Sequence, residues 1–374
     1  MRALLLATAV LMAVPASASA ADVVIDGRGW GHGIGMSQYG AYGYALREGR
    51  DHRFILEHYY TGTTLGDAPG TRMRVLLQAS RAPSVSGATA ARGGGRLVRL
   101  TATRRYRFTP IARGRLALTD VSTGRRRARL RGPITITGGA TTRLWGLAQN
   151  GVTSGLYRGR MVFSRSGRSV LAVNCVGLEP YLFGVVPAEM PSSWPAEALK
   201  AQAVVARSYA LTSRRGGPTF DVYADVRSQV YRGVTGEMST TNEAVRATTG
   251  RVVLAAGQVA QTFFFSTSGG RTQGNEEEWG GAPYSYLRPV DDPHDDLSPY
   301  HTWQVRLSRA RVASLLRDYT QGRFRRLRVR SRTPSERVAT VSVVGRGGTT
   351  VVSGATVRAR LGLLSNWITR ITGP

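Results

Sequence analysis

One glutamate lies among neighbours that are nearly all apolar, which makes it the first candidate for acid–base chemistry. Glu189 follows the apolar residues 185–188 and precedes Met190, Pro191 and Trp194. Because apolar surroundings disfavour a charged carboxylate, such a side chain holds its proton toward neutral pH. A general acid needs this property. Glu189 could instead stabilise the start of the helix that follows, and the residues alone leave both roles open.

Two cations lie on the helix predicted after this glutamate. An Ala-rich stretch over residues 195–213 predicts a helix, with Pro195 suited to its first turn. Lys200 and Arg207 are seven residues apart, two turns along one stripe. Lys200 is the only lysine of the chain, so a compact ammonium at this position favours a specific role. A close ammonium would, however, lower the pKa of Glu189 and oppose the effect of burial.

A second segment combines alternating glycines with side chains suited to binding a sugar. Residues 27–41 read GRGWGHGIGMSQYGA, which differs from the dinucleotide pattern G-x-G-x-x-G. Alternating glycines allow a sugar or another chain to approach the backbone closely. His32, Gln38 and Tyr39 would then offer a stacking surface and hydrogen bonds. For His32 alone, a buried turn with a satisfied imidazole is the commoner explanation.

The elements around these segments predict an α+β fold, in which a β-rich layer is interleaved with helices around one active-site groove. Short β-type runs separated by Gly, Ser and Arg fill residues 72–175. Helices are expected from about Ser37, over 195–213, over 239–249 and over 308–317. Further strands are expected at 23–25, 252–255, 259–266, 303–307, 326–330, 339–344 and 350–353.

The N-terminus predicts export. Residues 1–20 have a basic start, a short apolar run and a final Ala-Ser-Ala, which is typical of a signal peptide cleaved near Ala20. The apolar run is shorter than a membrane span requires. We therefore expect a secreted or cell-envelope (cell-wall) protein without a transmembrane segment. Its expected parts are residues 21–66, which complete the core domain, and residues 67–374.

The charge and composition of the chain limit the kinds of molecule that it is expected to bind. The chain has 51 Lys+Arg against 23 Asp+Glu, a formal charge of +28. Nucleic acid is the usual partner of so basic a protein, but export argues against it. A bacterial wall instead offers carboxylates and phosphodiesters, both of which suit the guanidinium group.

No cofactor or metal is expected. The single cysteine, Cys175, excludes a disulfide framework and a Cys-rich zinc site, and five histidines leave little room for a multi-His centre. The acidic runs at 276–278 and 291–296 could hold a hard cation, although such runs more often face solvent.

Together the two segments resemble the stage II sporulation protein D / LytB amidase-enhancer family (SpoIID/LytB). The resemblance covers about residues 72–366 and is carried by VVPAEMPSSWPAEALKAQAVVARSYAL at 185–211, DVRSQVYRG at 225–233, FSTSGGRT at 265–272, EWG at 278–280 and YL at 286–287. In that family the GHGxGMSQYGA run follows the other motifs. Here it comes first, which indicates a circular permutation.

The resemblance implies a peptidoglycan lytic transglycosylase. Glu189 would protonate the glycosidic oxygen between N-acetylmuramic acid and N-acetylglucosamine, and would then help to close a 1,6-anhydro ring. Lys200 and Arg207 match family positions near that glutamate. The expected substrate-binding residues are His32, Gln38, Tyr39, Tyr209, Asp225, Gln229, Tyr231, Ser266, Ser268 and Gly269.

The expected partners are peptidoglycan glycan strands, together with anionic wall polymers or a wall amidase. The family name also implies a link to sporulation. Two other functions stay open. One is a non-catalytic, wall-binding amidase enhancer, and the other is a glycosidase that uses water and a second carboxylate such as Asp225.

Overall fold

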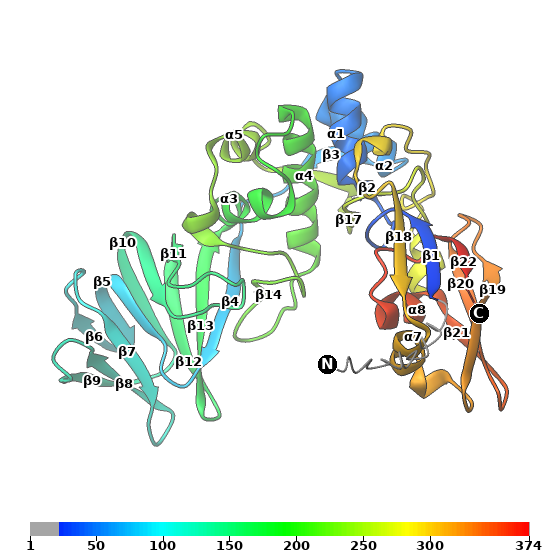
Figure 1. The fold of residues 1–374 in the computed structure, drawn as a ribbon. Helices are drawn as coiled ribbons and strands as arrows, with labels where there is room; N and C mark the ends of the chain where they lie inside the picture. The colour runs from blue at the N-terminus through cyan, green and yellow to red at the C-terminus, as the bar shows by residue number, and fades with distance from the viewer. Residues whose placement is uncertain (1–21, 374) are drawn as a thin grey trace, which may run out of the picture. The chain divides into compact units, whose positions relative to one another are not determined.

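The computed structural model of the chain describes residues 22–373, so the predicted signal peptide lies outside the described residues. The contacts divide these residues into two units (Figure 1). Unit 1 comprises residues 22–27 and 303–373, and unit 2 spans Arg28–Thr302. Both units combine helices with strands, which confirms the predicted α+β class. The division into residues 21–66 and 67–374 stays a prediction.

An eleven-stranded sheet makes up the β-rich part of unit 2. Its strands follow the order β14-β4-β13-β12-β10-β5-β7-β8-β9, while β11 pairs with β10 and β6 with β5. Apolar side chains from one face of the sheet form the core, where Phe108 and Phe163 stack at 4.1 Å between ring centroids. The strands are β4 (Arg72–Ser80), β5 (Ser84–Gly93), β6 (Arg96–Arg99), β7 (Tyr106–Pro110), β8 (Arg115–Asp120), β9 (Arg126–Arg131), β10 (Ile134–Trp145), β11 (Leu156–Tyr157), β12 (Arg160–Ser166), β13 (Ser169–Gly177) and β14 (Val222–Tyr223).

Helix α3 (Leu178–Glu189) packs against this sheet, and α4 (Ala196–Thr212) and α5 (Ser239–Ala247) pack against α3 and against each other. Two prolines, Pro187 and Pro191, flank Glu189. Pro187 lies inside α3, and the helix ends at Glu189. Met190 is extended, as a residue before proline prefers to be. Helix α4 starts directly after Pro195, and its small side chains let α1, α3 and α5 pack closely around it.

The remaining elements of unit 2 bring the glycine–histidine segment beside the second half of the chain. Helix α1 begins where the sequence predicted, since the Ser37 hydroxyl accepts a hydrogen bond from the N–H of Gly40 at 3.1 Å. Strand β2 pairs in parallel with β17, with Met36 opposite Phe264. The elements are β2 (Met36–Ser37), α1 (Gln38–Arg47), α2 (His52–Tyr59), β3 (Thr64–Asp67), β15 (Arg251–Ala255), β16 (Gln258–Val259), β17 (Phe264–Phe265) and α6 (Asn275–Trp279).

The strand predicted over residues 259–266 is interrupted. Only its two ends, β16 and β17, are strands. Between them, the main-chain N–H of Gln261 donates to the hydroxyl of Tyr286, and the carbonyl of Phe263 accepts from the hydroxyl of Tyr60. These main-chain groups thus bond to side chains, and the run is not one continuous strand.

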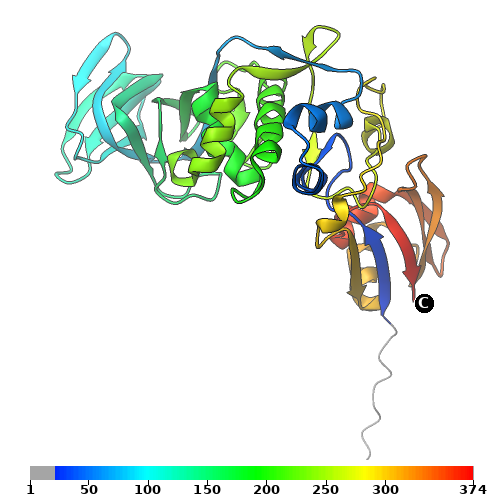
Figure 2. The same cartoon turned by 90° about the horizontal axis from the view of Figure 1, so that it is seen from above.

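Unit 1 joins both ends of the described chain. Strand β1 (Val23–Arg28) lies between β18 (Thr302–Leu307) and β22 (Ile368–Thr372), and Figure 2 shows it beside β22. A second sheet has the order β19-β20-β21. Its strands and the unit's helices are β19 (Phe324–Arg332), β20 (Val338–Gly345), β21 (Thr349–Ser353), α7 (Arg309–Leu315) and α8 (Gly354–Leu361). Within residues 22–373, no helix combines the length and the apolar character needed to span a membrane.

Candidate functional site

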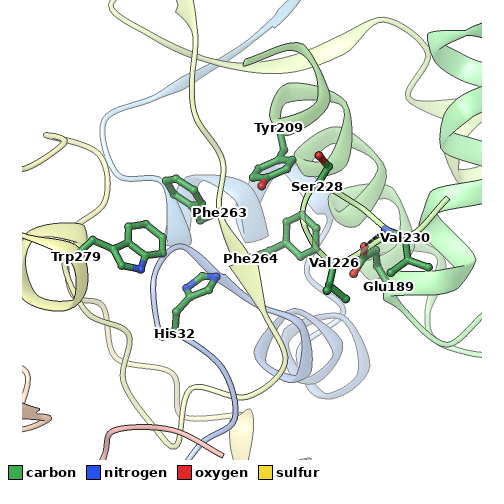
Figure 3. Close-up of a pocket in the computed structure, with 9 residues that line it drawn as sticks. All are labelled: His32, Glu189, Tyr209, Val226, Ser228, Val230, Phe263, Phe264 and Trp279. Carbon is green, nitrogen blue, oxygen red and sulfur yellow. Dashed lines mark hydrogen bonds between the residues drawn. The ribbon is translucent and has the colours of Figure 1, made fainter. Parts of the chain in front are cut away.

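A cavity of about 310 Å³ in unit 2 contains Glu189 in its wall (Figure 3). Its lining comes from segments that are far apart in the sequence: His32, Glu189, Tyr209, Val226, Ser228, Val230, Phe263, Phe264 and Trp279. Of these nine residues, Glu189 is the one carboxylate. The cavity therefore combines a single acid with mostly apolar and aromatic walls.

Glu189 is fixed through both its side chain and its main chain. It is half-buried at the C-terminal end of α3, and its Oε1 accepts a hydrogen bond from the N–H of Val230 at 3.4 Å (Figure 3). Its main-chain carbonyl accepts from Nε2 of Gln38 at 3.0 Å. The carboxylate and the peptide group are thus oriented by two segments that follow and precede it by many residues.

Burial shifts the titration of this carboxylate. Removal from water raises the pKa of Glu189 to about 7, while the Val230 N–H and the charge of Arg232 act in the opposite direction. Because burial outweighs both, a large fraction of the carboxyl groups is protonated at neutral pH. A group in this state can donate a proton and, once ionised, accept one.

Aromatic rings form the wall across from the glutamate. Trp279 lies 4.6 Å from Phe263 and 5.2 Å from His32, measured between ring centroids. Tyr209 lies 6.1 Å from the rings of Phe263 and Phe264. Rings of this kind suit the apolar faces of sugars. The sequence argument named His32 and Tyr209 but passed over Phe263, since an apolar residue in a predicted strand gives no signal of a binding role.

Gln38 and Tyr39 of the glycine–histidine segment lie outside the cavity lining. Gln38 is buried, and besides the carbonyl of Glu189 it reaches Oε1 of Gln202 on α4 at 3.2 Å. Tyr39 packs on Trp194, with 4.9 Å between ring centroids, and lies outside the cavity lining.

The two cations predicted near Glu189 have other carboxylates as partners. Nζ of Lys200 lies 2.6 Å from Glu197, one turn earlier on the same helix. Arg207 is fully buried and binds Glu179 through two nitrogens, at 2.6 and 2.9 Å. It also donates to the carbonyl of Arg251. Neither cation lines the cavity. Both instead form ion pairs within the helices beside it.

Alternate residues of the segment 225–231 line the cavity. Val226, Ser228 and Val230 line the cavity. The predicted site residues lie at the other positions. Asp225 forms an ion pair with Arg227 at 2.6 Å, which lowers the pKa of this carboxyl. Gln229 and Tyr231 are buried, and the Tyr231 hydroxyl donates to Asn174 at 2.9 Å. A period of two in the sequence could have indicated that alternate residues face the site.

The predicted Ser266, Ser268 and Gly269 belong to a loop held by a buried carboxylate. Asp295 accepts hydrogen bonds from the N–H groups of Ser268 and Gly269, both at 2.8 Å, and from the hydroxyl of Ser37 at 2.9 Å. The main-chain carbonyl of Ser266 accepts from the N–H of Tyr39 at 3.0 Å. This loop is therefore tied to the start of α1 and lies outside the cavity lining.

The acidic runs at 276–278 and 291–296 are mostly engaged within the protein. Glu276 pairs with Arg288, and Asp296 with Arg47. Asp292 is buried next to Asp295, and burial together with that neighbouring charge raises its pKa to about 7. Across residues 22–373, no group of three or more His, Cys, Asp or Glu side chains is arranged to hold a metal ion.

The central part of the chain is similar to known proteins. Residues 166–254, which include α3, α4 and Glu189, match the family model of the stage II sporulation protein, SpoIID. The predicted resemblance to the SpoIID/LytB family is confirmed. Its permuted order of motifs stays a prediction.

Individual relatives agree with the family match. The chain is 30% identical to the stage II sporulation protein D of Bacillus subtilis (strain 168) over 211 residues, which are 52% of this chain and 60% of that protein. It is 37% identical to the amidase enhancer of the same strain over 140 residues, 37% of this chain and 19% of that protein. An uncharacterized protein of Brachyspira hyodysenteriae is 36% identical over 143 residues, 37% of this chain and 38% of that protein. The chain thus spans 60% or less of the length of these relatives.

Proposed function

We propose that this protein is a peptidoglycan lytic transglycosylase in which Glu189 acts as both acid and base. The observation that carries the proposal is a single carboxylate with a pKa of about 7 in a cavity lined mainly by apolar and aromatic groups. Glycosidases that use water require a second carboxylate in the site. A lytic transglycosylase does not, because the nucleophile is a hydroxyl of the substrate itself.

The reaction needs two proton transfers at one side chain. Protonated Glu189 donates its proton to the oxygen that bridges N-acetylmuramic acid and N-acetylglucosamine, and the bond from that oxygen to the muramic C1 breaks. The resulting carboxylate then accepts the proton of the muramic C6 hydroxyl, while the oxygen of that hydroxyl bonds to C1. The products are a 1,6-anhydro end and a free N-acetylglucosamine hydroxyl, and Glu189 is again protonated.

The surrounding residues support binding of a glycan. The rings of Trp279, Phe263 and Tyr209 offer surfaces for sugar rings, and the hydroxyls of Tyr209 and Ser228 offer hydrogen bonds at the cavity wall. The N–H of Val230 holds one carboxylate oxygen, so the other oxygen is left for the substrate. Lys200 and Arg207 act on this site through the packing of α4 against α3.

A role in the cell wall agrees with the relatives named stage II sporulation protein D and amidase enhancer. It also agrees with the predicted signal peptide, which would deliver the protein to the envelope. The proposed substrate is the glycan strand of peptidoglycan.

The test is to digest purified glycan strands, with and without stem peptides, using the mature protein. We expect products with 1,6-anhydro ends, and we expect Glu189→Gln to reduce their release by about 100-fold or more. Glu243→Gln is the matched control, because Glu243 is an exposed carboxylate on α5 and lies outside the cavity lining. Products with reducing ends would indicate hydrolysis by water, and products unaffected by Glu189→Gln would remove this residue from its role.

The amidase-enhancer relative supports a second candidate function, in which the protein binds the wall and stimulates an amidase without cleaving glycan. The two functions are separated by adding wild-type protein or Glu189→Gln to a peptidoglycan amidase. Equal stimulation by both proteins, with no anhydro ends in either digest, would favour the enhancer.

A further inference from the structure

The β-rich sheet of unit 2 carries an extreme charge. Residues 72–177 contain 21 arginines and no lysine against one acidic residue, Asp120. Asp120 is itself occupied, since it binds Arg104 at 2.7 Å and Ser122. Most of the net charge of the whole protein therefore resides in this one sheet. No step of the proposed cleavage uses it.

The strand register places many of these arginines on one face. Directly opposed residues of antiparallel strands point to the same side of a sheet. Trp145 of β10 lies opposite Ser84 of β5, which lies opposite Arg107 of β7. Arg107 lies opposite Thr119 of β8, which lies opposite Arg126 of β9. One row of side chains thus crosses five neighbouring strands.

The next positions along the strands add further arginines to this side. Arg115 of β8 lies opposite Arg131 of β9, and Ala117 lies opposite Arg129. The alternate residues of the same strands, such as Leu116 and Leu130, are buried in the core. We call the exposed side the arginine face and define it by Arg107, Arg115, Arg126, Arg129 and Arg131, which are all exposed.

No carboxylate neutralises this face. Within residues 22–373, none of its five arginines forms an ion pair. At its border, the guanidinium groups of Arg105 and Arg143 lie 4.7 and 5.7 Å from the Trp145 ring. Guanidinium groups without acidic partners repel one another, and a bound anion would relieve this repulsion.

We propose that the arginine face binds a phosphodiester-linked anionic polymer of the cell wall. Arginine forks match phosphate oxygens in a bidentate manner, and successive arginines on one strand lie about 7 Å apart, as alternate residues of a strand do. A polymer with a phosphate in every short repeat can meet several of them at once. The stem carboxylates of peptidoglycan are spaced more widely along the glycan.

Nucleic acid shares the phosphodiester but fits this face less well. Surfaces that bind single strands present aromatic side chains on which bases stack. In the rows traced above, Trp145 is the one aromatic residue, and two guanidinium groups already lie over its ring. The cell-wall source of the polymer rests on the proposed function, whereas the phosphodiester chemistry does not.

The test measures binding of the mature protein to purified walls that carry poly(glycerol phosphate). The same walls treated with hydrofluoric acid, which removes the phosphodiester polymer and leaves peptidoglycan, serve as the comparison. Single-stranded DNA with an equal number of phosphates is the third ligand. We expect untreated walls to bind at least about tenfold more tightly than treated walls or DNA, with an affinity that falls steeply with salt.

Two variants with the same change in charge locate the binding surface. One replaces Arg107, Arg115, Arg129 and Arg131 by Gln, and the other replaces Arg325, Arg326, Arg328 and Arg330 of β19, which are also exposed. We expect the first to weaken binding about tenfold or more and the second less than about threefold. Circular dichroism and thermal unfolding check that both variants fold.

The outcomes separate this proposal from its competitors and from the proposed function. Equal loss in both variants would mean that net charge alone attracts the wall. Equal binding to treated walls would assign the face to carboxylates, and tighter binding to DNA would assign it to nucleic acid. Each of these results overturns the proposal. Glu189→Gln should keep full affinity, and the first variant should still release anhydro ends from soluble glycan, so either function can fail alone.

Discussion

Gln38 and Glu189 are 151 residues apart in the chain, yet the Gln38 side chain donates a hydrogen bond to the main-chain carbonyl of Glu189 at 3.0 Å. The same amide nitrogen reaches Gln202 on α4 at 3.2 Å. The glycine–histidine segment is therefore linked to the candidate acid through the last residue of α3. It influences where the carboxylate lies without touching the carboxylate.

Replacing Gln38 by Leu should reduce cleavage more than stability alone explains. The change leaves the buried carbonyl of Glu189 without this partner, so we expect a loss of about 1–3 kcal/mol in unfolding free energy. A displaced carboxylate should also lower kcat about tenfold at unchanged KM. Gln261→Leu is the control, because its amide binds Ser213 away from the cavity. A Gln38→Leu protein with normal kcat when folded would contradict a positioning role.

The rate of glycan cleavage should depend on pH through Glu189. Since burial raises the pKa of this carboxyl to about 7, the protonated form needed for donation is lost as pH rises above that value. We expect kcat to fall about tenfold for each pH unit above the transition. A profile of initial rates from pH 5 to 9 measures it. A rate that stays level to pH 9 would rule out a proton donor of this kind.

Glu189→Gln should also alter stability in a pH-dependent way. The pKa of the folded state, about 7, exceeds the ordinary value of 4.5, so the folded protein binds the extra proton between these values. The contribution of this group to the free energy of unfolding is fully present below pH 4.5 and is lost as pH rises to about 7. The free energy of unfolding of the variant should equal that of wild type at pH 4. At pH 8 it should be higher by about 2 kcal/mol, a value that allows for solvent in the open cavity. Urea unfolding at both pH values measures the difference.

Removing the charge of Arg207 should reduce the stability of the protein much more than removing the charge of Lys200. Arg207 is fully buried, and its loss would leave Glu179 without its partner, so Arg207→Met should cost about 3 kcal/mol or more. Lys200 pairs with Glu197 near the surface, so Lys200→Met should cost less than about 1 kcal/mol. Thermal unfolding compares the two. If Lys200 instead acted directly on Glu189, its removal would raise the pKa seen in the pH–rate profile.

Local signals in the sequence predicted several elements correctly. Ser37 caps α1, Pro195 precedes α4, and the alternating Arg and apolar residues at 326–330 lie in β19. Each of these depends on neighbours within a few residues. The ion pair of Lys200 with Glu197, three residues away, is local in the same sense.

Such local signals could not predict contacts between segments that are far apart in the chain. The partner of Arg207 is Glu179, 28 residues earlier, and the pairing requires α3, which Pro187 in its last turn concealed. The Val230 N–H that binds Glu189 is a main-chain group, so no side chain marks it. Phe263 enters the cavity wall only because β2 pairs with β17 next to it.

The pairing of β1 with β22 has a consequence for how the protein is made. Val24 lies opposite Thr372 and Ile25 opposite Ile371, so β1 can pair with β22 only after all of unit 2 has been synthesised. Unit 2 is complete in sequence about 70 residues earlier. Unit 1 therefore closes after unit 2, and until then the apolar side chains of Val23 and Ile25 lack their full cover and are open to binding by a chaperone.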